Sequence, residues 1–216
     1  MGELQDRMIE EMKLRNLSEK TIKSYIREML VYTKRYGKSP ANLGEPEIRA
    51  YLKYLREEKG LSSSSLNVSY SALRFFYTNI LNRKFCVEKI SRPKREKKLP
   101  IVLSQDEVKR IIENCRNEKY KTILMAVYST GCRLAEAVRL KITDIDRDRK
   151  TVRIEQGKGK KDRYSILSQT LLIKLSEYWK LYRPKSYFFT AYNPNIHIGE
   201  SVVQVEFRAA KKKQVF

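Results

Sequence analysis

The sequence has few of the features that membrane and exported proteins require. No stretch approaches the ~20 consecutive apolar residues of a membrane-spanning helix. The N-terminus, MGELQDRMIEEMK, carries acids where a signal peptide has basic and then apolar residues. Gly2 lacks the downstream Ser or Thr of a myristoylation motif. We therefore expect a cytoplasmic protein.

Metal-ligating residues are also scarce. His197 is the single histidine, with no cluster of Cys, His or carboxylate residues around it in the sequence. Cys86, Cys115 and Cys132 are odd in number, far apart and without C-x-x-C spacing. We expect reduced, partly buried thiols and no zinc or other metal site.

Positive charge, in contrast, is abundant along the whole chain. Lys and Arg number 46 against 25 Asp and Glu, a formal net charge of +21. A compact protein this basic repels itself, and a polyanionic partner relieves the repulsion. Nucleic acid is the leading candidate, which would place the protein on the nucleoid. A solvated, lysine-rich surface of the kind that thermophilic proteins use is the alternative.

Residues 1–86 show the pattern of a compact helical unit. Ser18 as N-cap and Gly37 as C-cap enclose a stretch with apolar residues at helical spacing. Pro46 begins another helix that ends near Gly60, and LSSSSLNVSYSALRFFYTNIL predicts a third. One more helix precedes Ser18, so the unit holds four.

Residues 87–103 interrupt this periodicity. In SRPKREKKLPIVLS, Pro93 and Pro100 oppose helix formation, and the residues between them are almost all charged. The segment is predicted to be an extended linker. A solvated connector and a basic strap across a phosphate backbone are both open interpretations.

Residues 104–216 predict a second, mixed domain. Ser104 and Glu107 form a capping box, and YKTILMAVYSTG predicts a central apolar helix. The following elements are a short helix running into an extended segment, a hairpin with strands at 151–154 and 164–167, a helix at 169–182, a short strand in SYFFT, and a helix from about Ser201.

Two short motifs in this domain could carry chemistry. Arg133 follows the most apolar helix at a Thr-Gly turn, and its guanidinium could hold a phosphate; Glu136 lies on the same helical face. Alternatively, Arg133 is an ordinary exposed residue of a surface turn.

Lys158 lies between two glycines at the hairpin tip, in a segment that lacks the sequence pattern of a Walker loop. It could present an ammonium to a phosphate or a leaving oxygen, or simply belong to a lysine-rich turn.

The chain resembles the tyrosine recombinase (phage integrase) family, in its Xer-like and transposon-integrase branch, because its sequence blocks match the family's blocks in the same order. LSEKTIKSY, GLSSSSLNVSYSALRFFY, PKREKKLPIVLSQDEV, YSTGCRLAEAVRLKITDID and GKGKKDRY follow the family's order. TGCRLAEA and GKGKKDR are the specific ones, because the family shows T-G-x-R-x-x-E-x and G-K-G-x-K-x-R there.

The resemblance implies a mainly α fold, with an N-terminal SAM-like four-helix DNA-binding domain and an α+β catalytic domain containing a small antiparallel sheet. It implies site-specific recombination of double-stranded DNA through a 3′-phosphotyrosine, without a metal or nucleotide cofactor. Arg133 would clamp the phosphate, Glu136 would support it, and Lys158 would serve the leaving 5′-oxygen. The domains would form a C-shaped clamp, and protomers would assemble on DNA as a tetrameric synapse.

The resemblance also turns the polar helix faces and the linker into candidate DNA-binding surfaces. Some of these side chains could equally belong to plain solvated faces. The candidates are Lys20, Lys23, Arg27, Asn67 and Arg74 on helices, and Lys94, Arg95, Lys97 and Lys98 in the linker.

The family's later catalytic groups cannot be placed in this sequence. His197 has no arginine three residues on, so it does not begin the family's H-x-x-R motif. The tyrosines of the second domain precede the position of that motif, so we expect no nucleophile among them and assign core or surface roles to Tyr178, Tyr182, Tyr187 and Tyr192.

The C-terminal stretch VEFRAAKKKQVF is similar to the family's lead-in to H-x-x-R, F-x-x-A-A-K-K-A-G-I. We hypothesise a frameshift at the lysine codons, which would leave the catalytic domain incomplete; a deliberately expressed fragment and a short regulator are the alternatives. The sequence thus predicts either a recombinase with an incomplete site or a non-catalytic DNA-binding protein that occupies recombination sites. The ordered blocks argue against an RNA- or ribosome-binding protein.

Overall fold

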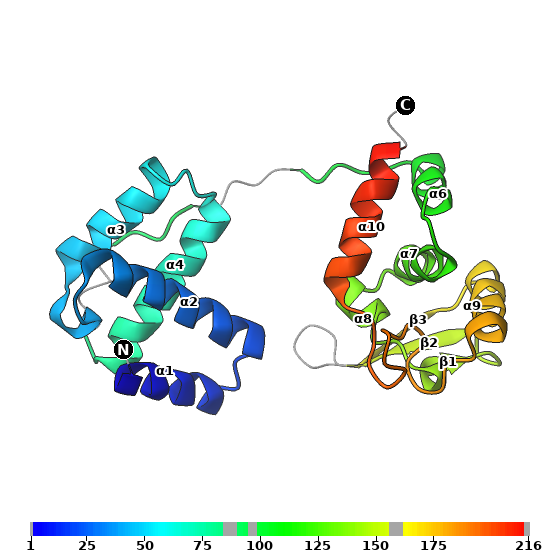
Figure 1. Cartoon of the computed structure of the whole chain (residues 1–216), viewed down its shortest axis with the longest axis horizontal. Helices are drawn as coiled ribbons and strands as arrows, with labels where there is room; N and C mark the ends of the chain where they lie inside the picture. Colours follow the sequence, from blue (N-terminus) through cyan, green and yellow to red (C-terminus); the bar gives the residue numbers. More distant parts are fainter. Residues whose placement is uncertain (1, 84–89, 95–98, 156–161, 214–216) are drawn as a thin grey trace. The chain divides into compact units, whose positions relative to one another are not determined.

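The computed structural model describes residues 2–83, 90–94, 99–155 and 162–213. The chain divides into two compact units, Met1–Pro100 and Ile101–Phe216, a boundary that falls within the predicted linker (Figure 1). Within the described ranges, no helix combines the length and the apolar character needed to cross a bilayer. The predicted fold class, mainly α with a small antiparallel sheet, is confirmed.

The first unit is built from helices whose ends follow local sequence signals. Ser18 caps its helix by accepting the backbone N–H of Thr21, and Gly37 ends it with φ of 61°. Glu47 accepts the N–H of Gly44 at 2.8 Å, so the third helix begins one residue before the predicted Pro46. The elements are α1 (Gly2–Leu14), α2 (Glu19–Tyr36), a 3₁₀ turn (Pro40–Asn42), α3 (Glu45–Glu57), α4 (Ser63–Phe75) and a π-helical turn (Phe76–Ile80).

Tyrosines join the helices of this unit in one continuous core. Tyr32, Tyr51 and Tyr77 are fully buried, and the Tyr32 ring meets the Tyr51 ring edge-on at 4.9 Å. The Tyr77 hydroxyl donates to the Pro40 carbonyl at 2.9 Å and lies 3.2 Å from the Tyr32 hydroxyl. Burial, followed by this hydroxyl pair, raises the pKa of Tyr32 far above its ordinary range. This pairing satisfies the hydroxyls of Tyr32 and Tyr77 inside the apolar core.

The beginning of the predicted linker packs against this unit. Ile90 is buried in the core, and its carbonyl accepts the Tyr70 hydroxyl at 3.1 Å. The Asn67 amide donates to the Pro93 carbonyl at 2.8 Å. Residues 90–93 are therefore part of the first unit rather than a free connector.

The second unit surrounds a small antiparallel sheet with the order β1-β2-β3. Its register pairs Thr151 with Ile166 and Ile154 with Arg163. The capping box of Ser104 and Glu107 is confirmed. The elements are α6 (Gln105–Glu113), α7 (Glu118–Thr130), α8 (Leu134–Ala137), a 3₁₀ turn (Ile142–Asp144), β1 (Ile145–Asp146), β2 (Thr151–Ile154), β3 (Arg163–Ile166), α9 (Gln169–Tyr182) and α10 (Glu200–Lys213).

One predicted strand is wrong. Tyr187 and Thr190, in the SYFFT stretch, form only isolated bridges, with Lys141 and His197. The Phe188 N–H donates to the Leu140 carbonyl and the Phe189 carbonyl accepts the Ile198 N–H, so the stretch bonds to two different segments instead of forming one ladder. The stretch instead closes the core between α9 and α10 as an irregular segment.

Candidate active site

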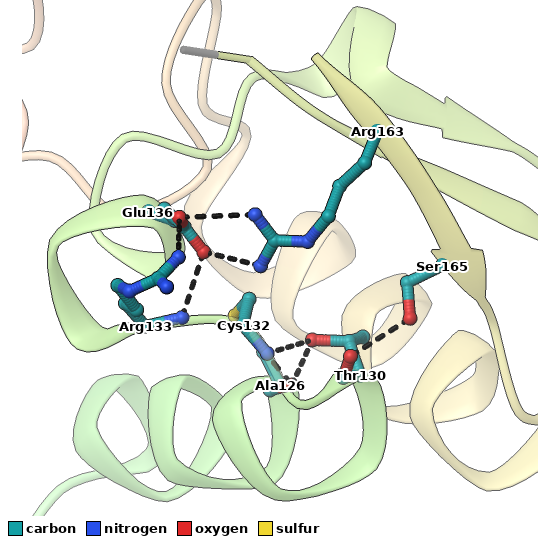
Figure 2. Close-up of polar contacts among 7 residues, drawn as sticks. All are labelled: Ala126, Thr130, Cys132, Arg133, Glu136, Arg163 and Ser165. Atoms are coloured by element: carbon teal, nitrogen blue, oxygen red, sulfur yellow. Dashed lines mark hydrogen bonds and ion pairs between the residues drawn. The ribbon is translucent and has the colours of Figure 1, made fainter. Parts of the chain in front are cut away.

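The turn between α7 and α8 provides a fixed base for the predicted site (Figure 2). Gly131 ends α7 in the left-handed region with φ of 63°, which a side chain would strain. The Thr130 hydroxyl donates to the Ala126 carbonyl at 2.7 Å and accepts the Cys132 amide at 3.2 Å. Because Ala126 and Cys132 are buried, this turn is anchored in the core of the unit.

Arg133 leaves this turn as the residue that precedes α8. Glu136 accepts its backbone N–H at 2.8 Å and its guanidinium Nη1 at 2.9 Å. The Arg133 side chain remains 55% exposed, whereas the Glu136 side chain is 7% exposed. The predicted support of Arg133 by Glu136 is thus present in the geometry, with the carboxylate buried and the guanidinium open to solvent.

Arg163, the first residue of β3, completes the cluster. Its Nη1 and Nη2 donate to the two Glu136 oxygens at 3.1 and 2.6 Å, across 27 residues of sequence. These bonds, opposed by burial and helped by the Arg133 donors, lower the pKa of Glu136 to about 2. Figure 2 shows both arginines converging on this one carboxylate.

Arg163 is the site residue that sequence reasoning missed. It is the last residue of the GKGKKDR block, at the position where the family pattern has arginine. Spacing gives no reason to pair it with Glu136, because only the folded hairpin brings the two together. The family pattern includes Arg163, and the structure shows that its partner is Glu136.

A second contact fixes the same strand. The Ser165 hydroxyl donates to the Thr130 carbonyl at 2.7 Å, which ties β3 to the end of α7. The hairpin base is therefore held against the α7–α8 turn at two points. Lys158 falls between the strands and lies outside the described residues.

The predicted DNA-binding side chains of the first unit have different surroundings. Lys20, Lys23, Arg27 and Arg74 are exposed, and the Arg27 side chain reaches 81% exposure. Lys94 is exposed as well. The remaining linker candidates, Arg95, Lys97 and Lys98, lie outside the described residues.

The surroundings of Asn67 differ from the sequence-based expectation that its side chain faces DNA. It is only 2% exposed, because residues 90–93 cover it. Its amide nitrogen donates to the carbonyls of Ser63 and Pro93, each at 2.8 Å, and its amide oxygen accepts Arg92 Nε at 2.8 Å. Helical periodicity placed Asn67 on the polar face of α4, but that face is partly occupied by the protein's own chain.

The cysteines and tyrosines behave as structural residues where they are described. Cys115 and Cys132 are buried free thiols, and burial raises the pKa of both. Tyr178 is buried against Phe189, so of the two roles expected for it, core or surface, it has the core role. Among the described residues, no group of three His, Cys, Asp or Glu is arranged to hold a metal ion. Cys86 lies outside that part of the chain.

Comparison with protein families gives one match for each of the two units. Residues 4–86 match the phage integrase N-terminal SAM-like domain, and residues 102–215 match the phage integrase family. The chain belongs to the phage integrase family. The blocks that contain Arg133 and Arg163 both fall within the second match, so their convergence on Glu136 lies in the family's catalytic region.

Curated relatives extend this result. The putative integrase/recombinase y4qK of Sinorhizobium fredii is 44% identical over 190 residues, covering 88% of this chain and 62% of that protein. A tyrosine recombinase of Thermosipho africanus is 30% identical over 196 residues, covering 85% of this chain and 69% of that protein. The chain spans 62% and 59% of the length of y4qK and of y4eF, a second Sinorhizobium fredii relative.

Solved structures share the fold. A lambda integrase tetramer bound to a Holliday junction gives a TM-score of 0.78 at 16% identity, covering 100% of this chain and 64% of that one. XerH recombinase bound to difH substrate in a pre-cleavage complex gives a TM-score of 0.70 at 18% identity, covering 97% of this chain and 68% of that one. At these identities the similarity establishes the architecture alone.

Proposed function

We propose that this chain binds double-stranded DNA as part of a site-specific tyrosine recombinase and uses Arg133 to hold the phosphate at the strand-exchange point. The observation that carries the proposal is the convergence of Arg133 and Arg163 on Glu136. It joins Arg133 and Glu136 of the TGCRLAEA block to Arg163, the last residue of the GKGKKDR block, and leaves the Arg133 guanidinium exposed.

The geometry suits stabilisation of a phosphoryl transition state. Negative charge grows on the non-bridging oxygens as the phosphodiester is attacked, and a pre-oriented guanidinium stabilises that charge without reorganising. A planar fork also fixes the phosphate's orientation by two parallel hydrogen bonds. Lys158 retains its proposed role as the donor to the leaving 5′-oxygen, by resemblance to the family. This chemistry requires no metal or nucleotide cofactor.

The first unit provides the proposed duplex-binding surface. Lys20, Lys23 and Arg27 are exposed on α2, and Arg74 is exposed on α4. Together with Lys94 and the net charge of +21, they favour contacts to the phosphate backbone. We expect the chain to associate with the nucleoid and with recombinase protomers on DNA, by analogy with the lambda integrase tetramer bound to a Holliday junction.

The second candidate is a DNA-binding protein that occupies recombination sites without cutting them. Burial keeps the Tyr178 hydroxyl away from a phosphate and raises its pKa, so this tyrosine stays protonated and is not available as the nucleophile. Under this proposal, no tyrosine of the described residues is assigned as the nucleophile.

A nicked suicide substrate separates the two candidates. Duplexes selected from a random library would first identify a bound site, and a nick near its centre would then prevent religation after cleavage. A covalent adduct that survives denaturing electrophoresis supports the complete recombinase activity. A retarded band without an adduct supports binding alone. Failure to retard any duplex at low salt would contradict both candidates.

A further inference from the structure

Glu136 is shared evenly between two arginines. Its Oε1 accepts Arg133 Nη1 at 2.9 Å and Arg163 Nη1 at 3.1 Å. Its Oε2 accepts the Arg133 backbone N–H at 2.8 Å and Arg163 Nη2 at 2.6 Å. Both oxygens are therefore occupied twice, and Arg163 provides the only bidentate fork among these bonds.

The charge of the cluster follows from this sharing. Two guanidinium groups face one carboxylate, so the cluster carries a net positive charge. The Arg133 side chain is 55% exposed and the Arg163 side chain 38% exposed, so Arg133 is the more accessible of the two. If Arg163 were neutral, Glu136 and Arg133 would form a simple ion pair with no net charge to offer an anion.

We propose that Arg163 is a positioning residue for Arg133. It engages Glu136 through a fork, so that Glu136 holds the backbone and one guanidinium nitrogen of Arg133 without neutralising its charge. The remaining donors of the Arg133 guanidinium are then available to a DNA phosphate. This inference rests on the proposed function, because it specifies how the same phosphate site is prepared.

The surrounding structure allows Arg163 to be changed without losing the strand. Ser165 ties β3 to Thr130 independently of Arg163, and the β2–β3 ladder pairs through Val152 and Ser165 as well as through Ile154 and Arg163. The two bonds between Glu136 and Arg133 do not involve Arg163. R163Q should therefore fold, which circular dichroism would check.

The test compares the DNA affinities of matched variants of the whole chain. The probe is a fluorescein-labelled duplex of about 30 base pairs, read by anisotropy over a series of salt concentrations. The variants are R133Q, R163Q, the double variant R133Q/R163Q, and E136Q/R163Q. R149Q is the control, because Arg149 also pairs with an acid three residues away, Asp146, yet lies outside the cluster.

We expect R133Q and R163Q each to weaken binding by roughly three- to tenfold, as for one lost phosphate contact. In the R133Q background, R163Q should change affinity by less than about twofold, because the residue acts through Arg133. E136Q/R163Q should recover most of the affinity lost in R163Q, since removing the carboxylate restores the free charge of Arg133. R149Q should bind like the unmodified chain.

Different results overturn different statements. If R133Q weakens binding but R163Q does not, or if R163Q weakens it equally with and without Arg133, the positioning role is wrong while the phosphate site stands. Failure of E136Q/R163Q to recover affinity while still folded would also contradict it. If R133Q itself binds like the R149Q control, the phosphate site is wrong and the inference fails with it.

A conservative variant decides the case in which R163Q does not fold. R163K keeps the charge but replaces the fork with a single ammonium. We expect it to bind DNA between the unmodified chain and R133Q, with R133Q/R163K indistinguishable from R133Q. An R163K effect that persists unchanged in the R133Q background would overturn the inference.

Discussion

The two units of this chain differ in how their candidate functional side chains are held. In the first unit, the exposed cations stand on α2 and α4, whose ends are set by nearby residues such as Ser18 and Gly37. In the second unit, the Glu136 carboxylate that bonds Arg133 also bonds Arg163, 27 positions further on, and the Ser165–Thr130 bond spans 35 positions. A binding surface can thus rest on local helix signals, whereas the proposed phosphate site needs the tertiary fold.

The largest expected effect tests whether the units are independent. Leu73 and Leu171 are each 1% exposed, in separate cores. Leu73→Ala and Leu171→Ala should each cost about 2–5 kcal/mol of unfolding free energy, through lost burial and the cavity left behind. Hydrogen exchange followed by mass spectrometry should show faster exchange only in α2–α4 for the first and only in α7–α9 for the second.

Trp179, the only tryptophan, lies in α9 and gives a second readout. Its fluorescence transition should shift to lower temperature in Leu171→Ala and stay in place in Leu73→Ala. A shift of equal size in both variants would show that the units unfold as one.

The pH dependence of the second unit comes next in size. Glu136 has a folded pKa of about 2 against an ordinary value of 4.5, so its bonds stabilise the fold fully above about pH 4.5. That stability is lost as the pH falls through 4.5 toward 2, on the order of 2–3 kcal/mol. Unfolding followed by Trp179 fluorescence should show this loss, and E136Q should lose less stability in acid by that amount, because Glu118 and Glu155 still contribute their own share. An E136Q variant with the same acid-induced loss would contradict the role of this carboxylate.

Asn67 offers a smaller test, in the first unit. Asn67→Ala removes bonds to Ser63, Arg92 and Pro93 and should cost about 1–3 kcal/mol. Hydrogen exchange should increase around Ile90, because the segment over α4 loses its main polar contact. Ser71→Ala is a suitable control, since its hydroxyl donates within α4, to the Asn67 carbonyl. Equal exchange in both variants would show that Asn67 does not hold the segment.

The smallest expected effect concerns the exposed cations. Lys23→Gln should leave thermal stability within about 0.5 kcal/mol, because the side chain is exposed. It should lower DNA affinity a few-fold and reduce the salt slope by about one unit. If Lys23→Gln changes neither the melting temperature nor the salt slope, Lys23 does not contact DNA.

Sequence reasoning located the helices well because their signals are local. The N-caps at Ser18 and Ser104 and the left-handed C-cap at Gly37 lie where the pattern predicts them. The strand expected in SYFFT failed because a buried apolar run does not distinguish a strand from an irregular core segment. The prediction that Asn67 faces a DNA groove does not hold, because the periodicity of α4 cannot show that residues 90–93 cover that face.

The candidate site was predictable only in part. The family blocks identified Arg133 and Glu136, and their spacing of three residues indicated the contact that is found. Arg163 was within a quoted block, yet its pairing with Glu136 depends on the hairpin folding back onto α8. Such a long-range ion pair leaves no periodic signal in a single sequence.

The most direct test of the account compares the salt dependence of DNA binding for R133Q and R149Q. If the exposed guanidinium of Arg133 holds a phosphate, R133Q should lower the slope of log affinity against log salt by about one unit, while R149Q leaves it unchanged. Equal slopes for R133Q, R149Q and the unmodified chain would contradict the proposed phosphate site.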